Sequence, residues 1–409
     1  AVLTKGPVGV ILPLFVFGAY LLMLRKYSLL TIFKALLYIG VSSLFLPLLW
    51  YIAAWKQGGD KFLDVVLAEN FGRFFHLNTP DINYDLGHEN GVWYNFMTLA
   101  AGFIPWTIFF FFSLFGLNWQ RKKGSFKQVL KDSWNNILSM EKEKLFSLVA
   151  LVCIIFFYSI PSSKRSVYLM PAYPFIAIFL AQYAIYITEY RTKVTRIFAA
   201  FLASVTTVVL IAIGLTMIGV IDPVAIASQY TSRTSTLAQV EAVSNIFSFS
   251  YGLTVCIVIV VLVALLTVLY QMFKKINIKI LYATIALSFT INLLIDGVIM
   301  RGIRQDGSAR PFAEKVMKEY PLNENNMFVM NNLKKYRNLY GLNFYLGNRF
   351  HNFEQEMPEE GFFFATSSDL EVVLKNYEGQ YTFNILTSSE RIIHEVRRPV
   401  VLCSFLRVK

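Results

Sequence analysis

The chain has 409 residues, of which 56% are hydrophobic and only 16% are charged, whereas an ordinary soluble domain carries about 25% charged residues. This composition excludes a water-soluble globular protein. The net charge of +12 would suggest nucleic acid as a partner of a soluble protein. Here the bases lie in loops between long apolar runs, so we expect membrane lipids as partners and no nucleic acid.

Eight apolar runs follow one another along the first three quarters of the chain. Most are near the length of ~18–20 residues that crosses a bilayer, and the run at 145–160 is the shortest. The runs cover residues 8–24, 35–55, 95–117, 145–160, 169–187, 197–220, 250–272 and 279–300. The sequence therefore predicts a mostly α fold class, a polytopic transmembrane helix bundle of about eight spans.

Lysine and arginine are distributed unevenly between the loops that join these runs. The loops after the first, third, fifth and seventh runs hold sixteen of them, and the alternate loops hold six. Because basic loops stay in the cytoplasm, the alternate loops and the C-terminal tail are expected on the outer side. We therefore predict a multi-pass membrane protein whose C-terminal part lies on the outer side, which in a bacterial inner membrane would be the periplasm.

Beyond residue 300 the numbers of basic and acidic residues become nearly equal, and short β-rich runs appear. Candidate strands lie at 327–330, 344–346, 362–365, 383–386 and 400–405, and candidate helices at 309–320, 333–340 and 368–377. Ser367 and Ser368 are expected to cap the last helix. The predicted organisation is a transmembrane region at 1–300 with a long outer loop at 56–94, followed by a small extracytoplasmic α/β domain at 301–409.

Two clusters of polar residues lie at the outer ends of the first two runs. Lys5 precedes Gly6 and Pro7, a sequence that breaks a helix and leaves backbone donors beside the ammonium, so an anion site and a snorkelling lysine are both open. Glu69 and Arg73 are spaced one helical turn apart. They form either an intrahelical ion pair or a phosphate site built on the forked guanidinium.

Two further clusters follow. His88 and Trp93 close the loop at 56–94, and Trp93 is either an aromatic residue of the membrane interface or part of a binding site. Lys164, Arg165 and Tyr168 lie in a tight outer turn, where adjacent cations oppose the positive-inside trend. An anionic partner or simple solvation accounts for these two cations.

The histidines do not predict a metal centre. The chain has four of them, and none is spaced like a zinc ligand pair. No cofactor is certain, but acidic residues and a phosphate in one site leave a divalent metal open.

In this order the clusters resemble the membrane GT-C glycosyltransferases of the aminoarabinose lipid A transferase type, which are related to protein O-mannosyltransferases. The resemblance rests on five elements between residues 3 and 177. They are Leu3 to Pro7, Asn70 to Phe74, His88 with Trp93 and Tyr94, Gly102 with Pro105 and Trp106, and Ser162 to Ala177. Asn70 replaces a histidine of the lipid A transferases, and the turn reads SSKRSVYLMP, so the resemblance is to the broader family.

The resemblance implies an inverting transferase that moves a sugar from a polyprenyl phosphate, such as undecaprenyl phosphate, to lipid A or another envelope glycan or protein. It implies that Lys5, Arg73 and Lys164, with Arg165, bind the phosphate. Tyr168, His88 and Glu69 would contact phosphate or sugar, and Trp93 would stack on a sugar ring. The family's catalytic acidic residues would precede Ala1. The rival hypotheses are a lipid or glycan flippase without covalent chemistry and a membrane scaffold.

Overall fold

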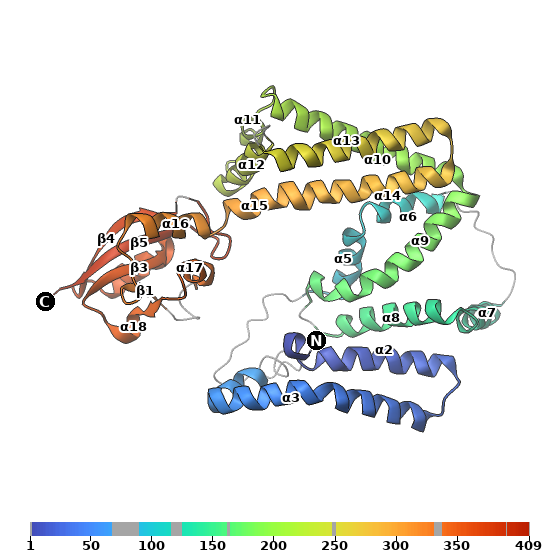
Figure 1. Cartoon of the computed structure of the whole chain (residues 1–409), viewed down its shortest axis with the longest axis horizontal. Helices are drawn as coiled ribbons and strands as arrows, with labels where there is room; N and C mark the ends of the chain where they lie inside the picture. Colours follow the sequence, from blue (N-terminus) through green and yellow to red (C-terminus); the bar gives the residue numbers. More distant parts are fainter. Residues whose placement is uncertain are drawn as a thin grey trace. The chain divides into compact units, whose positions relative to one another are not determined.

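A computed structural model describes residues 2–67, 90–115, 125–161, 164–247, 251–330, 338–389 and 391–408 of the chain. Most of the described residues are helical, and one sheet lies near the C-terminus (Figure 1). The chain divides into two compact units. The first comprises residues 1–199 with 276–281, and the second comprises 200–275 with 282–409.

The helices of the first unit account for the first five predicted apolar runs. Gly6 has a φ of 62° and separates the first two helices, which agrees with the break expected after Lys5. The helices are α1 (Val2–Lys5), α2 (Val8–Leu24), α3 (Leu29–Leu67), α5 (Tyr94–Gly102), α6 (Trp106–Phe115), α7 (Phe126–Leu138), α8 (Lys142–Ser159), the 3₁₀ helix η2 (Ser166–Ala172) and α9 (Tyr173–Tyr190).

The remaining helices carry the last three apolar runs and lead into the C-terminal domain. Two of them, α10 and α14, contribute residues to both units. They are α10 (Thr192–Met217), α11 (Pro223–Ser228), α12 (Thr234–Ile246), α13 (Gly252–Lys274), α14 (Asn277–Leu294), the π helix η3 (Ile295–Ile299) and α15 (Met300–Asp306).

Five of the described helical stretches are long and apolar enough to cross a membrane: 29–60, 166–190, 192–217, 252–274 and 277–304. A sixth is reached if α5 and α6 count as one span, although they are bent by 98°. The predicted count of about eight is therefore not confirmed. The run at 8–24 forms a helix that is somewhat short, and α8 begins with three charged residues that reduce its apolar length.

The break between α5 and α6 divides the run at 95–117, which the hydropathy pattern predicts as one span. Pro105 lacks a backbone N–H and follows the end of α5 at Gly102, so a continuous helix is unfavourable there. Backbone groups near the break are paired locally, because Phe103 donates to the Leu99 carbonyl and the Thr107 hydroxyl donates to the Ala100 carbonyl at 2.6 Å. Such pairing is required wherever a helix is interrupted within a membrane.

Close helix packing holds the first unit together. A Cβ atom at Gly18 of α2 would meet Leu36 of α3 at 3.0 Å, so this glycine permits the two helices to approach. On another face, α2 packs against α8 through Leu12, Val16, Leu145 and Val149. A second cluster joins α6, α9, α10 and α14. Its members are Phe109, Ala184, Ile187, Val194, Phe198 and Leu281.

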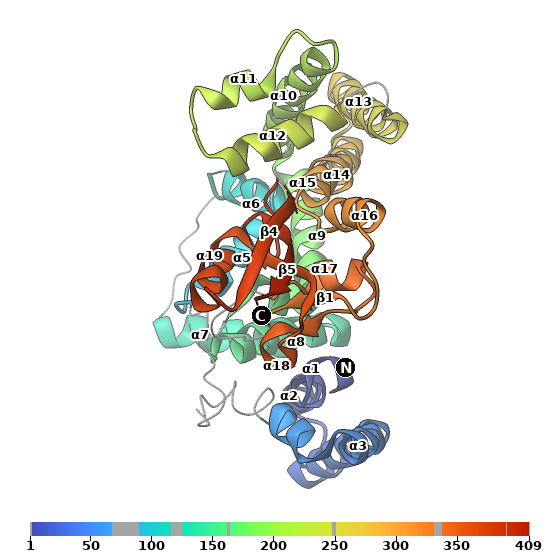
Figure 2. The ribbon, with the colours of Figure 1, turned by 90° about the vertical axis from the view of Figure 1, so that its left-hand side faces the viewer.

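The C-terminal domain contains a five-stranded mixed sheet in the order β2-β1-β3-β5-β4, in which β1 pairs in parallel with β2 and β3 while β5 is antiparallel to β3 and β4. Helices cover both faces (Figure 2). The strands are β1 (Met327–Val329), β2 (His351–Asn352), β3 (Glu360–Thr366), β4 (Tyr381–Ser388) and β5 (Val400–Arg407), and the helices are α16 (Arg310–Glu319), α17 (Tyr340–Tyr345), α18 (Phe353–Glu356) and α19 (Ser367–Asn376).

Alternating side chains of β3 and β5 form two hydrophobic cores. Phe364 and Leu402 face α16 and α17, whereas Phe363 and Cys403 face the opposite side, where Leu370 and Val373 of α19 pack. This period of two is what places consecutive side chains on opposite faces of a sheet. The domain is thus a sheet between two helical layers, as the sequence predicts for an α/β domain.

Two details of this domain differ from the predictions. Residues 344–346, expected as a strand, instead end α17 and lead out of it. The cap of α19 is Thr366, whose hydroxyl accepts from the Asp369 N–H at 3.2 Å, so Ser367 and Ser368 lie inside the first turn. Most of the helix expected at 333–340 lies outside the described residues. The division at residue 300 between membrane region and domain stays a prediction.

Candidate functional site

The predicted site residues fall into two groups. The side chains of Lys5, Glu69, Arg73 and His88 lie outside what the structure describes. The second group is Trp93, Lys164, Arg165 and Tyr168, and all four lie in the first unit near the junction of α5, α8 and η2.

Lys164 and Asn90 are joined by two hydrogen bonds although they are far apart in sequence. The Lys164 Nζ donates to the Asn90 carbonyl oxygen at 3.1 Å. In return, the Asn90 side-chain amide donates to the Lys164 carbonyl oxygen at 3.1 Å. The pair fixes Lys164, which follows α8, against the segment that leads into α5.

The Lys164 ammonium is buried, since the residue is only 5% exposed. Among the residues that the structure describes, the Asn90 carbonyl is the acceptor of its Nζ, and no described carboxylate forms an ion pair with it. An ammonium has three donors, and a buried charge without a partner is costly. This geometry leaves donor capacity for an anion, and neighbouring Arg165 is exposed.

Asn95 connects the same junction from the side of α5. It is 1% exposed, and its amide donates to the Tyr158 carbonyl at 3.0 Å and to the Ser159 hydroxyl at 3.1 Å. These groups belong to the last turn of α8, whose carbonyl oxygens have no partner inside the helix. Sequence reasoning missed Asn95, although an asparagine in an apolar run is a signal of buried polar contact.

Tyr168 lies on η2, which Leu169 and Ala172 anchor through fully buried side chains. Its ring stacks on that of Tyr158, with centroids 5.6 Å apart and planes 24° apart. The two phenol groups therefore lie on the same junction as the Lys164–Asn90 pair. Tyr158, like Asn95, was not among the predicted site residues.

Trp93 immediately precedes α5 and is 76% exposed. Its ring lies 5.9 Å from that of Phe96. An exposed indole of this kind suits either of the alternatives left open by the sequence, a stacking surface or a residue at the membrane interface. Its role in binding stays a prediction.

The described residues contain no group of three or more His, Cys, Asp or Glu side chains arranged to hold a metal ion. The junction offers an ammonium, amides and phenols, which are hydrogen-bond donors of the kind that bind anions. Anion binding at this junction stays a prediction.

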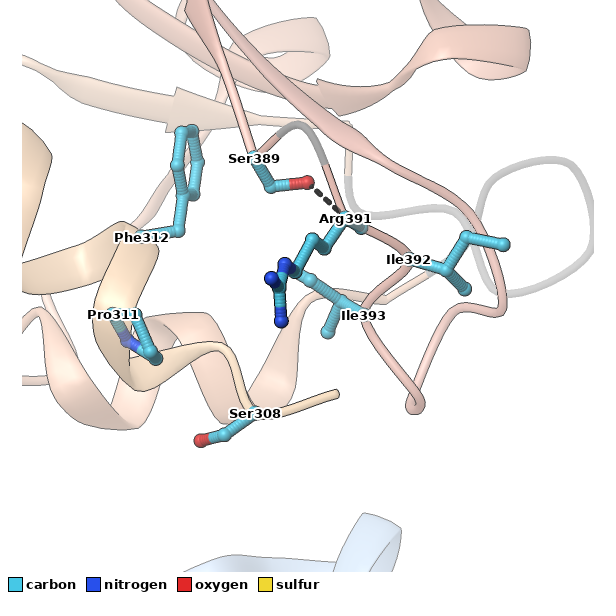
Figure 3. Close-up of a pocket in the computed structure, with 7 residues that line it drawn as sticks. All are labelled: Ser308, Pro311, Phe312, Ser389, Arg391, Ile392 and Ile393. Atoms are coloured by element: carbon cyan, nitrogen blue, oxygen red, sulfur yellow. Dashed lines mark hydrogen bonds between the residues drawn. The ribbon is translucent and has the colours of Figure 1, made fainter. Parts of the chain in front are cut away.

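A separate small pocket lies in the second unit, beside the first turn of α16 (Figure 3). Its volume is ≈ 200 Å³, and its walls combine apolar side chains with two serines and the Arg391 guanidinium. The Arg391 guanidinium also lies 4.0 Å from the Glu241 carboxylate of α12, an exposed pair of small energetic value. None of the predicted site residues lines this pocket. The lining residues are Ser308, Pro311, Phe312, Ser389, Arg391, Ile392 and Ile393.

Comparison with known sequences gives limited information. No family profile matches the chain. An uncharacterized protein of Aquifex aeolicus (strain VF5) is 30% identical over 184 residues, which make up 45% of this chain and 30% of that protein. The matched part thus spans less than a third of the relative's length.

Comparison with solved structures identifies the fold. The crystal structure of ArnT from Cupriavidus metallidurans bound to undecaprenyl phosphate matches with a TM-score of 0.60 over 98% of this chain and 66% of that one, at 15% identity. ArnT in the apo state matches with a TM-score of 0.56 over the same shares. The chain therefore has a GT-C-like membrane fold, which confirms the predicted helix bundle followed by a small α/β region.

Proposed function

We propose that the chain belongs to a membrane glycosyltransferase that takes a sugar from a polyprenyl phosphate and transfers it to an acceptor of the cell envelope. The carrying observation is the buried Lys164 ammonium, which Asn90 holds at the α5–α8–η2 junction. The fold supports the proposal, because ArnT, which shares it, binds undecaprenyl phosphate. The chain spans 66% of the length of that neighbour.

The proposed reaction is a displacement at the anomeric carbon with inversion. An acceptor oxygen forms the new glycosidic bond while the bond between the anomeric carbon and the phosphate oxygen breaks, and the polyprenyl phosphate leaves with the bonding electrons. Negative charge gathers on that phosphate, so pre-positioned cationic donors stabilise the transition state. We assign this task to Lys164, with Lys5, Arg73 and Arg165 as further cations.

The remaining predicted residues are assigned to positioning. Tyr168, His88 and Glu69 would contact phosphate or sugar through hydrogen bonds, and Trp93 would stack on a sugar ring. The acceptor decides whether a base is needed. An acceptor phosphate, as in lipid A, is already anionic, whereas a hydroxyl group of a glycan or protein requires a carboxylate to take its proton.

Transfer of radiolabelled sugar from a polyprenyl phosphate donor, measured with the full-length protein in proteoliposomes, tests the proposal. Lys164→Ala is expected to lower transfer at least tenfold, because one hydrogen bond between charged groups contributes about 1.5–3 kcal/mol. Lys131→Ala, on the exposed surface of α7, is the matched control and is expected to leave transfer unchanged. Wild-type transfer by Lys164→Ala would remove this lysine from the proposal.

We further propose that the junction and the C-terminal domain lie on the outer side of the inner membrane. Val92 and Glu359 are exposed and suit cysteine labelling. In spheroplasts, an impermeant maleimide is expected to label Val92→Cys and Glu359→Cys before lysis. Protection of either cysteine until the cells are lysed would contradict this orientation.

The flippase hypothesis is favoured by one observation, the 98° bend between α5 and α6. Broken helices line the substrate path in many transporters. The same proteoliposomes discriminate the two functions. A glycosyltransferase forms a covalent product and free polyprenyl phosphate, whereas a flippase moves the donor between leaflets and leaves its glycosidic phosphate bond intact.

A further inference from the structure

An open groove of ≈ 770 Å³ lies on the sheet of the C-terminal domain, at one end of a face that the described helices cover only in part. Its volume is within the range of about 300–1,000 Å³ found for small-ligand sites. The groove is bounded by the turn before β1 and by the adjacent ends of β3 and β5. Its lining residues are Asn323, Glu324, Asn325, Asn326, Glu360, Gly361, Phe362, Ser404 and Phe405.

The strand register shows which side chains share the face of the groove. Phe362 pairs with Ser404, and Glu360 pairs with Leu406, so these side chains share the face that carries Phe364 and Leu402 further along. The helices α16 and α17 cover the part around Phe364 and Leu402. Beyond Phe362 the described residues leave the same face open at the groove, and the exposed Thr382 and Asn384 of β4 extend it.

The turn that forms one wall is held by its own hydrogen bonds. The Asn326 side chain accepts from the Asn323 N–H at 2.8 Å and donates to the Pro321 carbonyl at 2.9 Å. The Asn326 carbonyl accepts from the Phe362 N–H at 2.8 Å, which ties the turn to β3. A Cβ atom at Gly361 would meet this carbonyl at 3.1 Å, so the close approach depends on glycine.

Polar groups in the groove remain available to a ligand. Among the described residues, the Asn325 amide, the Glu360 carboxylate and the Ser404 hydroxyl have no hydrogen-bond partner. Phe362 is half-buried and packs 6.3 Å from Tyr320, which gives the groove an apolar surface. The site thus combines acceptors, mixed donor–acceptor groups and one aromatic ring.

The charge of the groove excludes some ligands. It contains the carboxylates of Glu324 and Glu360, and the nearby cation Arg349 is already paired with Glu324 at 3.1 Å. An anionic ligand such as a phosphorylated sugar would be repelled. A metal ion is not favoured either, because the described residues place only these two carboxylates there and hard cations such as Ca²⁺ take six to eight oxygen ligands.

We propose that this groove binds an uncharged saccharide. Adjacent hydroxyl groups of a sugar each donate and accept, which matches the carboxylate of Glu360, the amide of Asn325 and the hydroxyl of Ser404. The less polar face of the sugar ring would lie on Phe362. The inference does not depend on the proposed transfer reaction, since the groove and its groups belong to the C-terminal domain.

Saturation-transfer NMR on the full chain in lipid nanodiscs tests the proposal without a polyprenyl donor. Nanodiscs avoid detergents with sugar headgroups, which would compete for the groove. The probes are the uncharged methyl glycosides of glucose, galactose, mannose and N-acetylglucosamine, with glucose 6-phosphate as the anionic counterpart. At least one uncharged glycoside is expected to give a saturation signal and to bind more tightly than glucose 6-phosphate.

Two variants and one control locate the binding. Glu360→Ala and Asn325→Ala are expected to weaken binding about tenfold, because each removes a ligand contact from an exposed position without touching the core. Glu371→Ala lies on the exposed surface of α19, across the sheet, and is expected to bind like wild type. Thermal unfolding of each variant verifies that the domain is folded.

Four outcomes would overturn the proposal. The first is the absence of a saturation signal with every glycoside, and the second is binding by both Glu360→Ala and Asn325→Ala that is as tight as that of wild type. The third is binding of glucose 6-phosphate at least as tight as that of the uncharged glycosides. The fourth is loss of glycoside binding on addition of EDTA. Loss of binding with EDTA would indicate that the groove holds a metal ion. None of them bears on sugar transfer, which is measured separately at Lys164.

Discussion

The Nζ of Lys164 and the side-chain amide of Asn90 each donate to the other residue's backbone carbonyl, both at 3.1 Å. This reciprocal arrangement orients the ammonium before any ligand arrives. Positioning a long lysine side chain otherwise costs conformational entropy, up to about 2 kcal/mol. Pre-orientation therefore raises the affinity for an anion that meets the remaining donors of Lys164.

Replacing Asn90 tests how Lys164 is positioned without removing the charge of its ammonium. Asn90→Ala removes one of the two hydrogen bonds but keeps the ammonium, so binding of undecaprenyl phosphate is expected to weaken about tenfold, and less than in Lys164→Ala. Binding is measured by native mass spectrometry of the full-length protein. A weaker effect for Lys164→Ala than for Asn90→Ala would contradict this order.

A second prediction concerns the close approach of α5 and α9. A Cβ atom at Gly102 would collide with the Tyr173 hydroxyl, and the Phe103 ring packs 4.9 Å from that of Tyr173. Gly102→Ala is expected to destabilise the fold by about 1–3 kcal/mol through overpacking. Thermal unfolding in nanodiscs is the measurement.

Tyr173→Phe provides the matched test, because it removes the oxygen that the new methyl group would meet first. In the double variant, part of the stability lost in Gly102→Ala is expected to return. Additive effects of the two changes would show that the tyrosine hydroxyl is not the source of the strain.

The edge of the C-terminal sheet contains a pH-sensitive ion pair. The Glu356 carboxylate, 2.9 Å from the His351 Nδ1, and the Glu324 carbonyl, 2.8 Å from Nε2, raise the pKa of His351. Since the unfolded pKa is about 6.5, the pair is fully stabilising below about pH 6.5. This contribution is lost as the pH rises through the higher folded pKa.

Glu356→Gln is therefore expected to lower the melting temperature of the domain more at pH 5.5 than at pH 8.5. The effect is limited to about 1 kcal/mol or less, because both side chains are more than a third exposed. Glu354→Gln, an exposed neighbour, is the control for general charge effects. An equal loss at both pH values would show that the histidine charge does not contribute.

Cys403 and its neighbour in β5 give a test of the sheet itself. Cys403 is fully buried, and this burial raises its pKa to about 12. Since the thiolate is the reactive form, Cys403 is expected to resist N-ethylmaleimide at pH 8 until the protein is unfolded. Mass spectrometry of native and denatured protein measures the labelling.

The adjacent position on the other face should behave differently. Ser404 is half-buried and lines the open groove, so Ser404→Cys is expected to react in the native state. Rapid labelling of Cys403 with protection of Ser404→Cys would mean that the register of β5 is shifted by one residue.

Hydropathy predicted the helices well because a bilayer admits few backbone structures, and each apolar run is mostly helical in the residues that the structure describes. It did not predict the bend within 95–117, although Gly102 and Pro105 were visible signals of a break. In the C-terminal domain, the apolar run at 344–346 predicts a strand, but these residues end α17 and follow it. A short apolar run does not distinguish a strand from a helix. Here Leu342 and Leu346, which are four residues apart as on one face of a helix, both pack on the core.

The site was less predictable than the fold. The sequence identified Lys164 as a cation with an unexplained position, but its pairing with Asn90 joins residues 74 positions apart. No local pattern encodes such a contact. Asn95 and Tyr158 were missed for the same reason, because their importance arises from where α5 and α8 meet. The open groove likewise results from strand order, which composition does not determine.

The position of β5 has a consequence for protein synthesis. This strand lies between β3 and β4, yet the ribosome makes it after both. Until Val400–Arg407 has emerged, β4 has no neighbouring strand in the described sheet, and Leu402 and Cys403 are missing from the two hydrophobic cores. Nascent chains that expose such surfaces are prone to aggregate. The domain therefore completes its sheet late, and nascent chains that end before Val400 are the ones most in need of a chaperone.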